Sequence, residues 1–522
     1  MKYSNYSIYN FEDLLQGNFL YVDKTEYIWQ LIKPSQAMYF LSRPRRFGKS
    51  LTISTLKAVF EGKKELFKGL AIYDKPYDWK PYPIIHLSFG DYNPVNNTSD
   101  KLNAYLQGKI MAIAQNLSVN LQRPTDPSDA FGKLIDKLSA KERVVILVDE
   151  YDKPILDNIT NPSIKEIQKC LKGFYGILKD RNHQERFLFV TGVSKFSHVS
   201  LFSDLNNLTD ITMDARYATM FGYTQKEFEA NFKEQIELAE KKQSLPHAEF
   251  LQKIKAWYDG FRFEENSESV YNPVSVAKFF EQGGKFNNYW FATGTPAFLL
   301  DLIKQKRFDF ETALNEPASE IAFSAYEVDN LEVLPLLLQA GYLTIKDSFQ
   351  QFDMTYYNLC FPNIEVKSAF DKYLLNTYTD IDKETLSKMV SSLARSVQNG
   401  DVDGFMESLK AFLAAIPYDI QLKDEKYYQT IFYTLFLLLG VYIEAEARTN
   451  KGRIDAVAAC GNWVYIFEFK LNQNAKAAMN QIRQKEYYQK YSQSGKNIIL
   501  IGANFDFAQR QITDWTQEDY PI

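Results

Sequence analysis

Residues 452–470 read GRIDAVAACGNWVYIFEFK and have the pattern of a β-hairpin. Gly461-Asn462 is a two-residue turn signal between flanks that are rich in β-branched and aromatic residues. A turn at this position sets the pairing of the two flanks and places Asp455 directly opposite Glu468. Side chains alternate along a strand, so the face with these carboxylates differs from the face that belongs in a core, formed by Ile454, Ala456, Phe467 and Phe469.

The same register places Arg453 opposite Lys470, so two carboxylates and two cations share one end of one face. Directly opposed carboxylates have β-carbons roughly 4.5–5.5 Å apart and repel one another, which favours a cation between them. Mg²⁺ or Mn²⁺ bound by Asp455 and Glu468 would also bind a scissile phosphate oxygen and a water. Lys470 would orient or deprotonate that water and stabilise the charge developing on phosphorus. The alternative is a surface hairpin whose charges face solvent.

The arrangement of Asp455 with Glu468-Phe469-Lys470 resembles the PD-(D/E)XK nuclease superfamily, in which a carboxylate and an (Asp/Glu)-x-Lys tripeptide lie on adjacent strands. The resemblance implies a metal-dependent phosphodiesterase with Asp455, Glu468 and Lys470 as catalytic residues. Some of these nucleases line the site with a helix, and three residues are spaced i, i+4 and i+7 to share one face of such a helix: Gln481, Lys485 and Tyr488. Glu446 is a candidate further acidic member.

Charge in this region favours a polyanionic partner. Residues 448–496 hold nine Lys or Arg against three Asp or Glu, a net charge of +6, whereas the whole chain carries −5. A basic patch can follow the phosphates of nucleic acid, although a run of charge is also typical of an ordinary solvated face.

Residues 37–50 read AMYFLSRPRRFGKS and form a second informative stretch. A short apolar strand leads into a loop that ends in Gly48-Lys49-Ser50, and a helical pattern follows. In a phosphate-binding loop, the backbone amides and the helix N-terminus cradle the phosphates, Lys49 reaches the β and γ phosphates, and Ser50 holds Mg²⁺. The general motif has glycine five residues before Gly48, and this chain has Arg43 there.

A partner strand is predicted at residues 144–150, which read VVILVDE. The apolar run suits a parallel strand buried on both faces, and its acids come at the carboxyl end, where open α/β sheets bind ligands. Asp149 would hold the Mg²⁺ shell, and Glu150 would polarise the attacking water. A further strand over residues 186–194 ends near Ser194, which would sense the γ phosphate. The alternative is an α/β domain with a decayed loop that binds no nucleotide.

This N-terminal pattern resembles the bacterial AAA-ATPase-like family, which carries Arg-Pro-Arg-Arg-Phe-Gly-Lys-Ser in place of a Gly-rich loop. Further family-like stretches are residues 21–25, 202–210 and 257–263. The resemblance covers nearly the whole chain and implies nucleotide binding together with a C-terminal PD-(D/E)XK domain. It makes Arg43, Arg45 and Arg46 candidate phosphate contacts, although Arg45 and Arg46 could equally pair with acids elsewhere.

Length and composition indicate several domains. The chain has 522 residues, of which 45% are hydrophobic, enough to build several cores. Its three cysteines are far apart, its four histidines lack metal-ligand spacing, and no apolar run is long enough for a signal peptide or membrane span. We therefore expect a cytoplasmic protein without a membrane partner.

The expected fold is a multidomain α/β protein. Its predicted parts are an AAA-like P-loop domain with a parallel sheet (1–222), a helical subdomain (223–325), a winged-helix-like segment (326–378), a helical connector (379–425) and a restriction-endonuclease-like α/β domain (426–522). The expected function is an ATP-binding ATPase coupled to a Mg²⁺-dependent nuclease acting on DNA or RNA. Two alternatives stay open: a nucleotide-switched protein that binds nucleic acid without cutting it, and a homo-oligomer in which cleavage needs assembly.

Overall fold

A computed structural model represents the chain. It describes residues 2–94, 97–122, 124–159, 161–195, 201–202, 205, 207–290, 297–306, 308, 310–323, 332–417, 425–440, 444–450 and 453–520. For residues 297–298, 301, 311, 425–426, 444–450 and 453–454 it describes the backbone alone. The chain divides into two compact units: unit 1 is Met1–Gly294 with Pro317–Asn363, and unit 2 is Thr295–Glu316 with Ile364–Ile522. The finer division made from the sequence stays a prediction.

Unit 1 contains a parallel sheet of five strands in the order β2-β3-β4-β1-β5. The strands are β1 (Ala37–Ser42), β2 (Ile84–Ser88), β3 (Val144–Asp149), β4 (Glu185–Gly192) and β5 (Thr209–Asp210). Every residue of β3 and β4 is buried, as expected for parallel strands that are covered on both faces. The strands predicted here are confirmed as β1, β3 and β4, and β4 lies between the other two.

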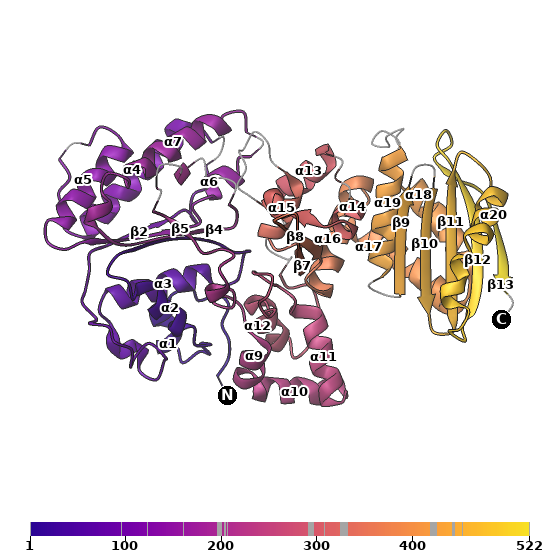
Figure 1. Cartoon of the computed structure of the whole chain (residues 1–522), viewed down its shortest axis with the longest axis horizontal. Coiled ribbons are helices and arrows are strands. Elements are labelled where there is room, and N and C mark those ends of the chain that lie inside the picture. Colours follow the sequence, from indigo (N-terminus) through magenta and orange to yellow (C-terminus); the bar gives the residue numbers. More distant parts are fainter. Residues whose placement is uncertain are drawn as a thin grey trace. The chain divides into compact units, whose positions relative to one another are not determined.

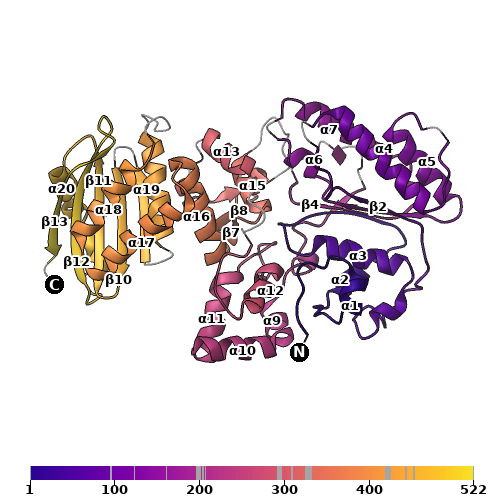
Figure 2. The same ribbon diagram turned by 180° about the vertical axis from the view of Figure 1, so that it is seen from behind.

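Helices cover both faces of this sheet (Figure 1 and, from behind, Figure 2). One face carries α1 (Phe11–Gln16), α2 (Thr25–Ile32) and α3 (Lys49–Phe60), and the other carries α4 (Ser99–Asn116), α5 (Pro127–Ser139), α6 (Lys153–Leu156) and α7 (Ile164–Gly176). Because the strands are parallel, their carboxyl ends lie along one edge, where open α/β sheets bind ligands. The loop after β1 and the acids after β3 therefore lie at the same edge.

Four helices follow the sheet in unit 1: α9 (Gln225–Asn231), α10 (Lys233–Gln243), α11 (His247–Tyr258) and α12 (Pro273–Glu281). We call them the helical subdomain. Their apolar faces share one core, which includes Phe228, Phe232, Phe250, Tyr258 and Phe279. The helical pattern predicted from residue 224 onward is confirmed by α9 and α10.

The remaining part of unit 1 is α15 (Val333–Gln339) followed by the hairpin of β7 (Thr344–Gln351) and β8 (Met354–Cys360), with β6 (Ala318–Ser319) beside β8. Gly341 separates helix from strand with φ = +83°, a conformation that glycine adopts without strain. The predicted passage from helix to strand at this glycine, and the second strand after it, are confirmed.

Unit 2 contains a mixed sheet in the order β13-β12-β11-β10-β9. Its strands are β9 (Glu444–Asn450), β10 (Arg453–Cys460), β11 (Trp463–Leu471), β12 (Asn497–Asp506) and β13 (Gln511–Tyr520). β11 and β12 are parallel, and the other neighbours are antiparallel. The predicted hairpin is confirmed as β10 and β11, with Asp455 paired with Glu468 and Arg453 with Lys470.

The helices of unit 2 are α13 (Ala297–Lys306), α14 (Phe310–Asn315), α16 (Ile364–Thr379), α17 (Lys383–Asn399), α18 (Val402–Ala414), α19 (Glu425–Leu439) and α20 (Ala475–Lys485). Four of them pack on the sheet: α20 on one face, and α17, α18 and α19 on the other. Met479 and Ile482 of α20 pack on the face that carries Ile466. Phe467 and Phe469 face the other way and contact Phe405 of α18 and Phe432 and Phe436 of α19.

Within the described ranges, no helix is long and apolar enough to cross a bilayer.

Glu185, the first residue of β4, is a buried carboxyl in the core of unit 1. Its side chain is 0% exposed, and neither carboxyl oxygen has a hydrogen-bond partner among the described residues. Burial raises the pKa of Glu185 from 4.5 to about 8. The folded state therefore binds this proton more tightly than the unfolded state does. The contribution to stability is complete below about pH 4.5 and is lost as the pH rises through about 8.

We expect Glu185→Gln to remove this pH dependence, because glutamine has the same shape and does not titrate. Between pH 5 and 8, the free energy of unfolding of the variant minus that of the wild type should increase by about 1.4 kcal/mol per pH unit. Thermal unfolding of both proteins, followed across this pH range, measures the difference. A difference in melting temperature that stays constant with pH would contradict the assignment.

Candidate functional site

The loop between β1 and α3, residues 43–50, is called the phosphate loop here. Gly48 precedes α3 with φ = +94°, and a β-carbon added there would have no atom within 4 Å, so open space adjoins this backbone. The helix begins at Lys49, and the amide groups of its first turn have no partner inside the helix. A helix N-terminus with an open approach can bind an anion.

The Lys49 side chain is folded back onto the phosphate loop. Its Nζ donates to the backbone carbonyl oxygens of Arg43 at 2.9 Å and Pro44 at 2.8 Å. Burial lowers the pKa of Lys49 to about 8, an effect opposed by the nearby carboxylates of Asp149 and Asp152. The ammonium is thus a buried cation that has acidic neighbours at the carboxyl edge of the sheet.

Three acids lie within four residues at the end of β3: Asp149, Glu150 and Asp152. Asp149 is 4% exposed, and its Oδ1 has no hydrogen-bond partner in the described part of the chain. Glu150 has φ = +54°, and burial followed by the charge of Asp149 raises its pKa. Carboxylate and hydroxyl oxygens are ligands that Mg²⁺ prefers, so Asp149 and Ser50 of α3 fit a magnesium ion bound with phosphates.

Asp152 is a residue that the sequence reasoning missed. Its Oδ2 accepts hydrogen bonds from the backbone N–H of Val193 at 3.0 Å and Ser194 at 2.8 Å, and from the Ser194 hydroxyl at 2.8 Å. The Ser194 side chain, predicted to sense a γ phosphate, therefore donates to Asp152. The only available sequence signal was the acidic run at the end of β3. That run does not predict that Asp152 contacts Val193 and Ser194 after β4.

The three arginines of the phosphate loop are placed differently. Arg43 is 1% exposed, and its guanidinium donates to the carbonyl oxygens of Ser42, Thr212 and Tyr217. Arg46 donates to the carbonyl oxygens of Tyr289 and Trp290. These contacts tie the loop to neighbouring backbone and lend no support to phosphate contacts. The positive charge of Arg45 acts to lower the pKa of both Lys49 and Glu150, and its predicted contact with phosphate stays a prediction.

A cavity of about 130 Å³ adjoins Gly48. Its walls include Leu51 and Thr52 from the first turns of α3, Tyr6 and Tyr9 from the N-terminal segment, Lys24, and Gly222 and Tyr223 before the helical subdomain. Sequence reasoning did not identify this cavity. The family-like stretch over residues 21–25 was the available signal, because Lys24 belongs to it.

The second site lies at the open end of β10 and β11. Glu468 is 0% exposed and Lys470 is 7% exposed, and Lys470 Nζ lies 2.9 Å from Glu468 Oε1. Lys470 Nζ also donates to Oε1 of Gln481 on α20, and the Tyr487 hydroxyl donates to Asp455 Oδ2 at 3.2 Å. The structure thus brings Asp455, Glu468, Lys470 and Gln481 together.

The electrostatics of this carboxylate pair favour a bound cation. Burial first, and then the adjacent carboxyl of Asp455, raise the pKa of Glu468, while Lys470 acts in the opposite direction. Glu468 Oε2 is buried and has no hydrogen-bond partner among the described residues. Among the described side chains, no group of three or more His, Cys, Asp or Glu has an arrangement that could by itself hold a metal ion. Two carboxylates fit Mg²⁺, which usually keeps several waters in its shell, and they fit Mn²⁺ through the same oxygen donors.

The three other predicted members of this site have different outcomes. The expectation that Tyr488 shares a helical face with Gln481 is wrong, because α20 ends at Lys485 and Glu486 has φ = +51°. Tyr488 lies in a following 3₁₀ turn and stacks on Tyr520, with ring centroids 4.3 Å apart. Lys485 is exposed on α20.

Glu446 lies on β9, where its backbone pairs with Val457. Its side chain is outside the described residues. Tyr487, which sequence reasoning missed, reaches Asp455 because the chain changes direction at the end of α20.

Comparisons with known proteins follow the same division of the chain. Residues 5–202 match a family model described as predicted AAA-ATPase, and residues 423–515 match a PD-(D/E)XK nuclease superfamily model. The chain is 37% identical over 530 aligned residues to a protein of Azotobacter chroococcum mcd 1 named "Uncharacterized protein in vnfD 5'region", and the alignment covers 98% of each chain. No solved structure matches. The phosphate loop and the acids at the end of β3 lie within the first matched region, and Asp455, Glu468, Lys470 and Gln481 lie within the second. Gly222 and Tyr223 of the cavity wall lie outside both regions.

Proposed function

We propose that this chain, which belongs to the predicted AAA-ATPase family and carries a C-terminal PD-(D/E)XK nuclease superfamily domain, binds ATP and cleaves nucleic acid with Mg²⁺ or Mn²⁺. The observation that carries the proposal is the convergence of partly buried Asp455 with buried Glu468 and Lys470. Placing a buried carboxylate directly beside a second, partly buried one is costly, and such an arrangement is typical of a site that holds a cation.

In the nuclease site, Asp455 and Glu468 would hold the metal. The metal would polarise the scissile phosphate and lower the pKa of a bound water. Lys470 has three N–H donors, and two of them go to Glu468 and Gln481. We assign the third to the attacking water or to a phosphate oxygen, where the positive charge would stabilise the transition state.

In the nucleotide site, the backbone amides from Gly48 onward would bind the phosphates. Lys49 would exchange its two loop carbonyls for phosphate oxygens, and Ser50 and Asp149 would hold the accompanying Mg²⁺. Glu150, whose pKa is raised by burial, would accept a proton from the attacking water during hydrolysis. The cavity beside Gly48 would receive the nucleoside.

The test is cleavage of labelled DNA and RNA, single- and double-stranded, with Mg²⁺ or Mn²⁺ and with or without ATP. We expect metal-dependent cleavage that EDTA abolishes, and a change in rate on adding ATP if the two sites are coupled. If folded protein cuts no substrate under these conditions but binds nucleic acid in an ATP-dependent way, the nuclease proposal is wrong. The chain would then be a nucleotide-switched binding protein.

A further inference from the structure

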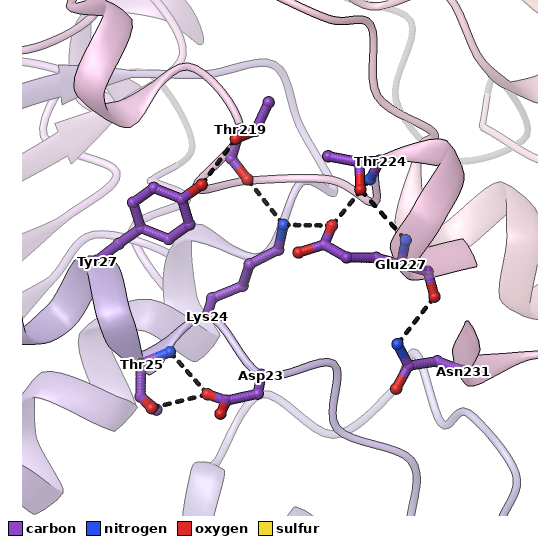
Figure 3. Close-up of polar contacts among 8 residues, drawn as sticks. All are labelled: Asp23, Lys24, Thr25, Tyr27, Thr219, Thr224, Glu227 and Asn231. Carbon is purple, nitrogen blue, oxygen red and sulfur yellow. Dashed lines mark hydrogen bonds and ion pairs between the residues drawn. The ribbon is translucent and has the colours of Figure 1, made fainter. Parts of the chain in front are cut away.

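Lys24 links the sheet part of unit 1 to the helical subdomain (Figure 3). Its Nζ donates to the carbonyl oxygen of Thr219 at 2.7 Å and to Glu227 Oε2 at 2.7 Å. Lys24 directly precedes α2, whereas Thr219 and Glu227 lie in the segment that leads into α9 and in α9 itself. The Tyr27 and Thr219 hydroxyls, 2.7 Å apart, add a second polar contact between the same two segments.

The backbone next to Lys24 is held firmly on the sheet side. Asp23 Oδ1 accepts hydrogen bonds from the Thr25 amide at 2.8 Å and hydroxyl at 2.7 Å. Asp23 Oδ2 accepts from the Ala71 amide at 2.7 Å, and the Thr25 hydroxyl oxygen accepts from the Ile72 amide at 3.0 Å. The backbone that carries the Lys24 side chain is therefore held in place by these hydrogen bonds.

The other end of the link is the start of α9. Glu227 Oε2 accepts the Thr224 amide at 2.8 Å, and the Thr224 hydroxyl oxygen accepts the Glu227 amide at 3.2 Å, which completes a capping box. One carboxylate oxygen thus serves both the helix cap and Lys24. Movement of the Lys24 ammonium would disturb the cap of a helix of seven residues, which has little stability of its own.

Lys24 also lines the cavity beside Gly48. Burial lowers the pKa of Lys24, and the charge of Glu227 opposes that effect. The side chain that borders the cavity is consequently the same one that holds the start of the helical subdomain.

We propose that Lys24 is a positioning residue that transmits occupation of this cavity to α9 through its ion pair with Glu227. A nucleoside in the cavity would restrict the Lys24 side chain, and the restricted side chain would hold Glu227 and the cap of α9 more tightly. The inference rests on the proposed binding of nucleotide at the phosphate loop.

The experiment is hydrogen–deuterium exchange of the full chain, with and without Mg²⁺ and a non-hydrolysable ATP analogue, read at residues 224–231. In the wild type, saturating analogue should slow exchange of these amides by about tenfold, the factor that corresponds to one charged hydrogen bond. In Lys24→Met, exchange of these amides should stay fast even at an analogue concentration that calorimetric titration shows to saturate the variant. Glu227→Gln retains an oxygen that can accept the Thr224 amide, and its amides at residues 224–231 should likewise exchange fast. This variant replaces Lys24→Met in the experiment if Lys24→Met does not fold.

The matched control is Lys75→Met. It removes an ion pair of the same length, 2.7 Å, to Glu26 on α2, and Lys75 neither lines the cavity nor contacts α9 in the described structure. This variant should keep the wild-type response. Equal slowing in Lys24→Met and wild type at saturating analogue would overturn the inference, and so would a wild type that binds the analogue without any change in α9. If the wild type binds no analogue, the proposed nucleotide site itself is wrong, and the inference falls with it.

Discussion

We expect Lys470→Met to lower the rate of the proposed metal-dependent cleavage by about 10²- to 10³-fold, the loss typical of removing one donor that stabilises transition-state charge. Methionine retains the apolar length of the side chain but cannot donate to Glu468 or Gln481. Glu468, buried beside Asp455, then loses its neighbouring cation, so its pKa rises further and metal binding weakens as well. Single-turnover cleavage and a Mg²⁺ titration of the same variant measure the two effects separately.

Lys476→Met is the matched control for this prediction. Lys476 is an exposed lysine at the start of α20, the helix that also carries Gln481. It should affect the cleavage rate little, because surface charges contribute small energies. If Lys470→Met and Lys476→Met cleave equally well, Lys470 has no part in catalysis and the site must be reassigned.

We expect Lys49→Met to weaken the proposed ATP binding by about 10- to 100-fold, the value of one or two charged hydrogen bonds to phosphate. The Lys49 Nζ donates to the Arg43 and Pro44 carbonyl oxygens, so the variant also loses contacts that shape the loop. Calorimetric titration with a non-hydrolysable analogue measures affinity, and thermal unfolding shows whether the fold is retained. Lys57→Met, on the same helix and paired with Glu61 at 3.8 Å, is the control. Equal affinity in both variants would remove the phosphate-loop assignment.

The same lysine predicts how nucleotide binding depends on pH. Burial lowers the pKa of Lys49 to about 8, so Lys49 loses its positive charge as the pH rises above about 8. Phosphate binding requires the charged form, and affinity should therefore fall above this pH in the wild type. In Lys49→Met the fall should be absent, since methionine does not titrate.

The local sequence pattern was sufficient to predict those parts of this protein whose geometry depends on residues close together in the chain. The pairing of Asp455 with Glu468 follows from the turn at Gly461 and from the two-residue period of strands, so the register was predictable. The order of strand, loop and helix around Gly48 was predictable for the same reason. In each case the chain itself carries the spacing that brings the groups together.

The sequence by itself thus determined both chemical motifs, the two α/β sheets that carry them and the register of the hairpin. The tertiary structure alone decided which distant groups complete the sites. Lys24 meets Glu227 across 203 positions, and Asp152 meets Ser194 across 42. Packing likewise decides which carbonyl oxygens accept hydrogen bonds from Arg43. It also decides the turn that brings Tyr487 to Asp455. Such contacts depend on how helices and strands pack against one another and on where a helix ends. The periodicity of side chains along a strand or helix specifies neither of these.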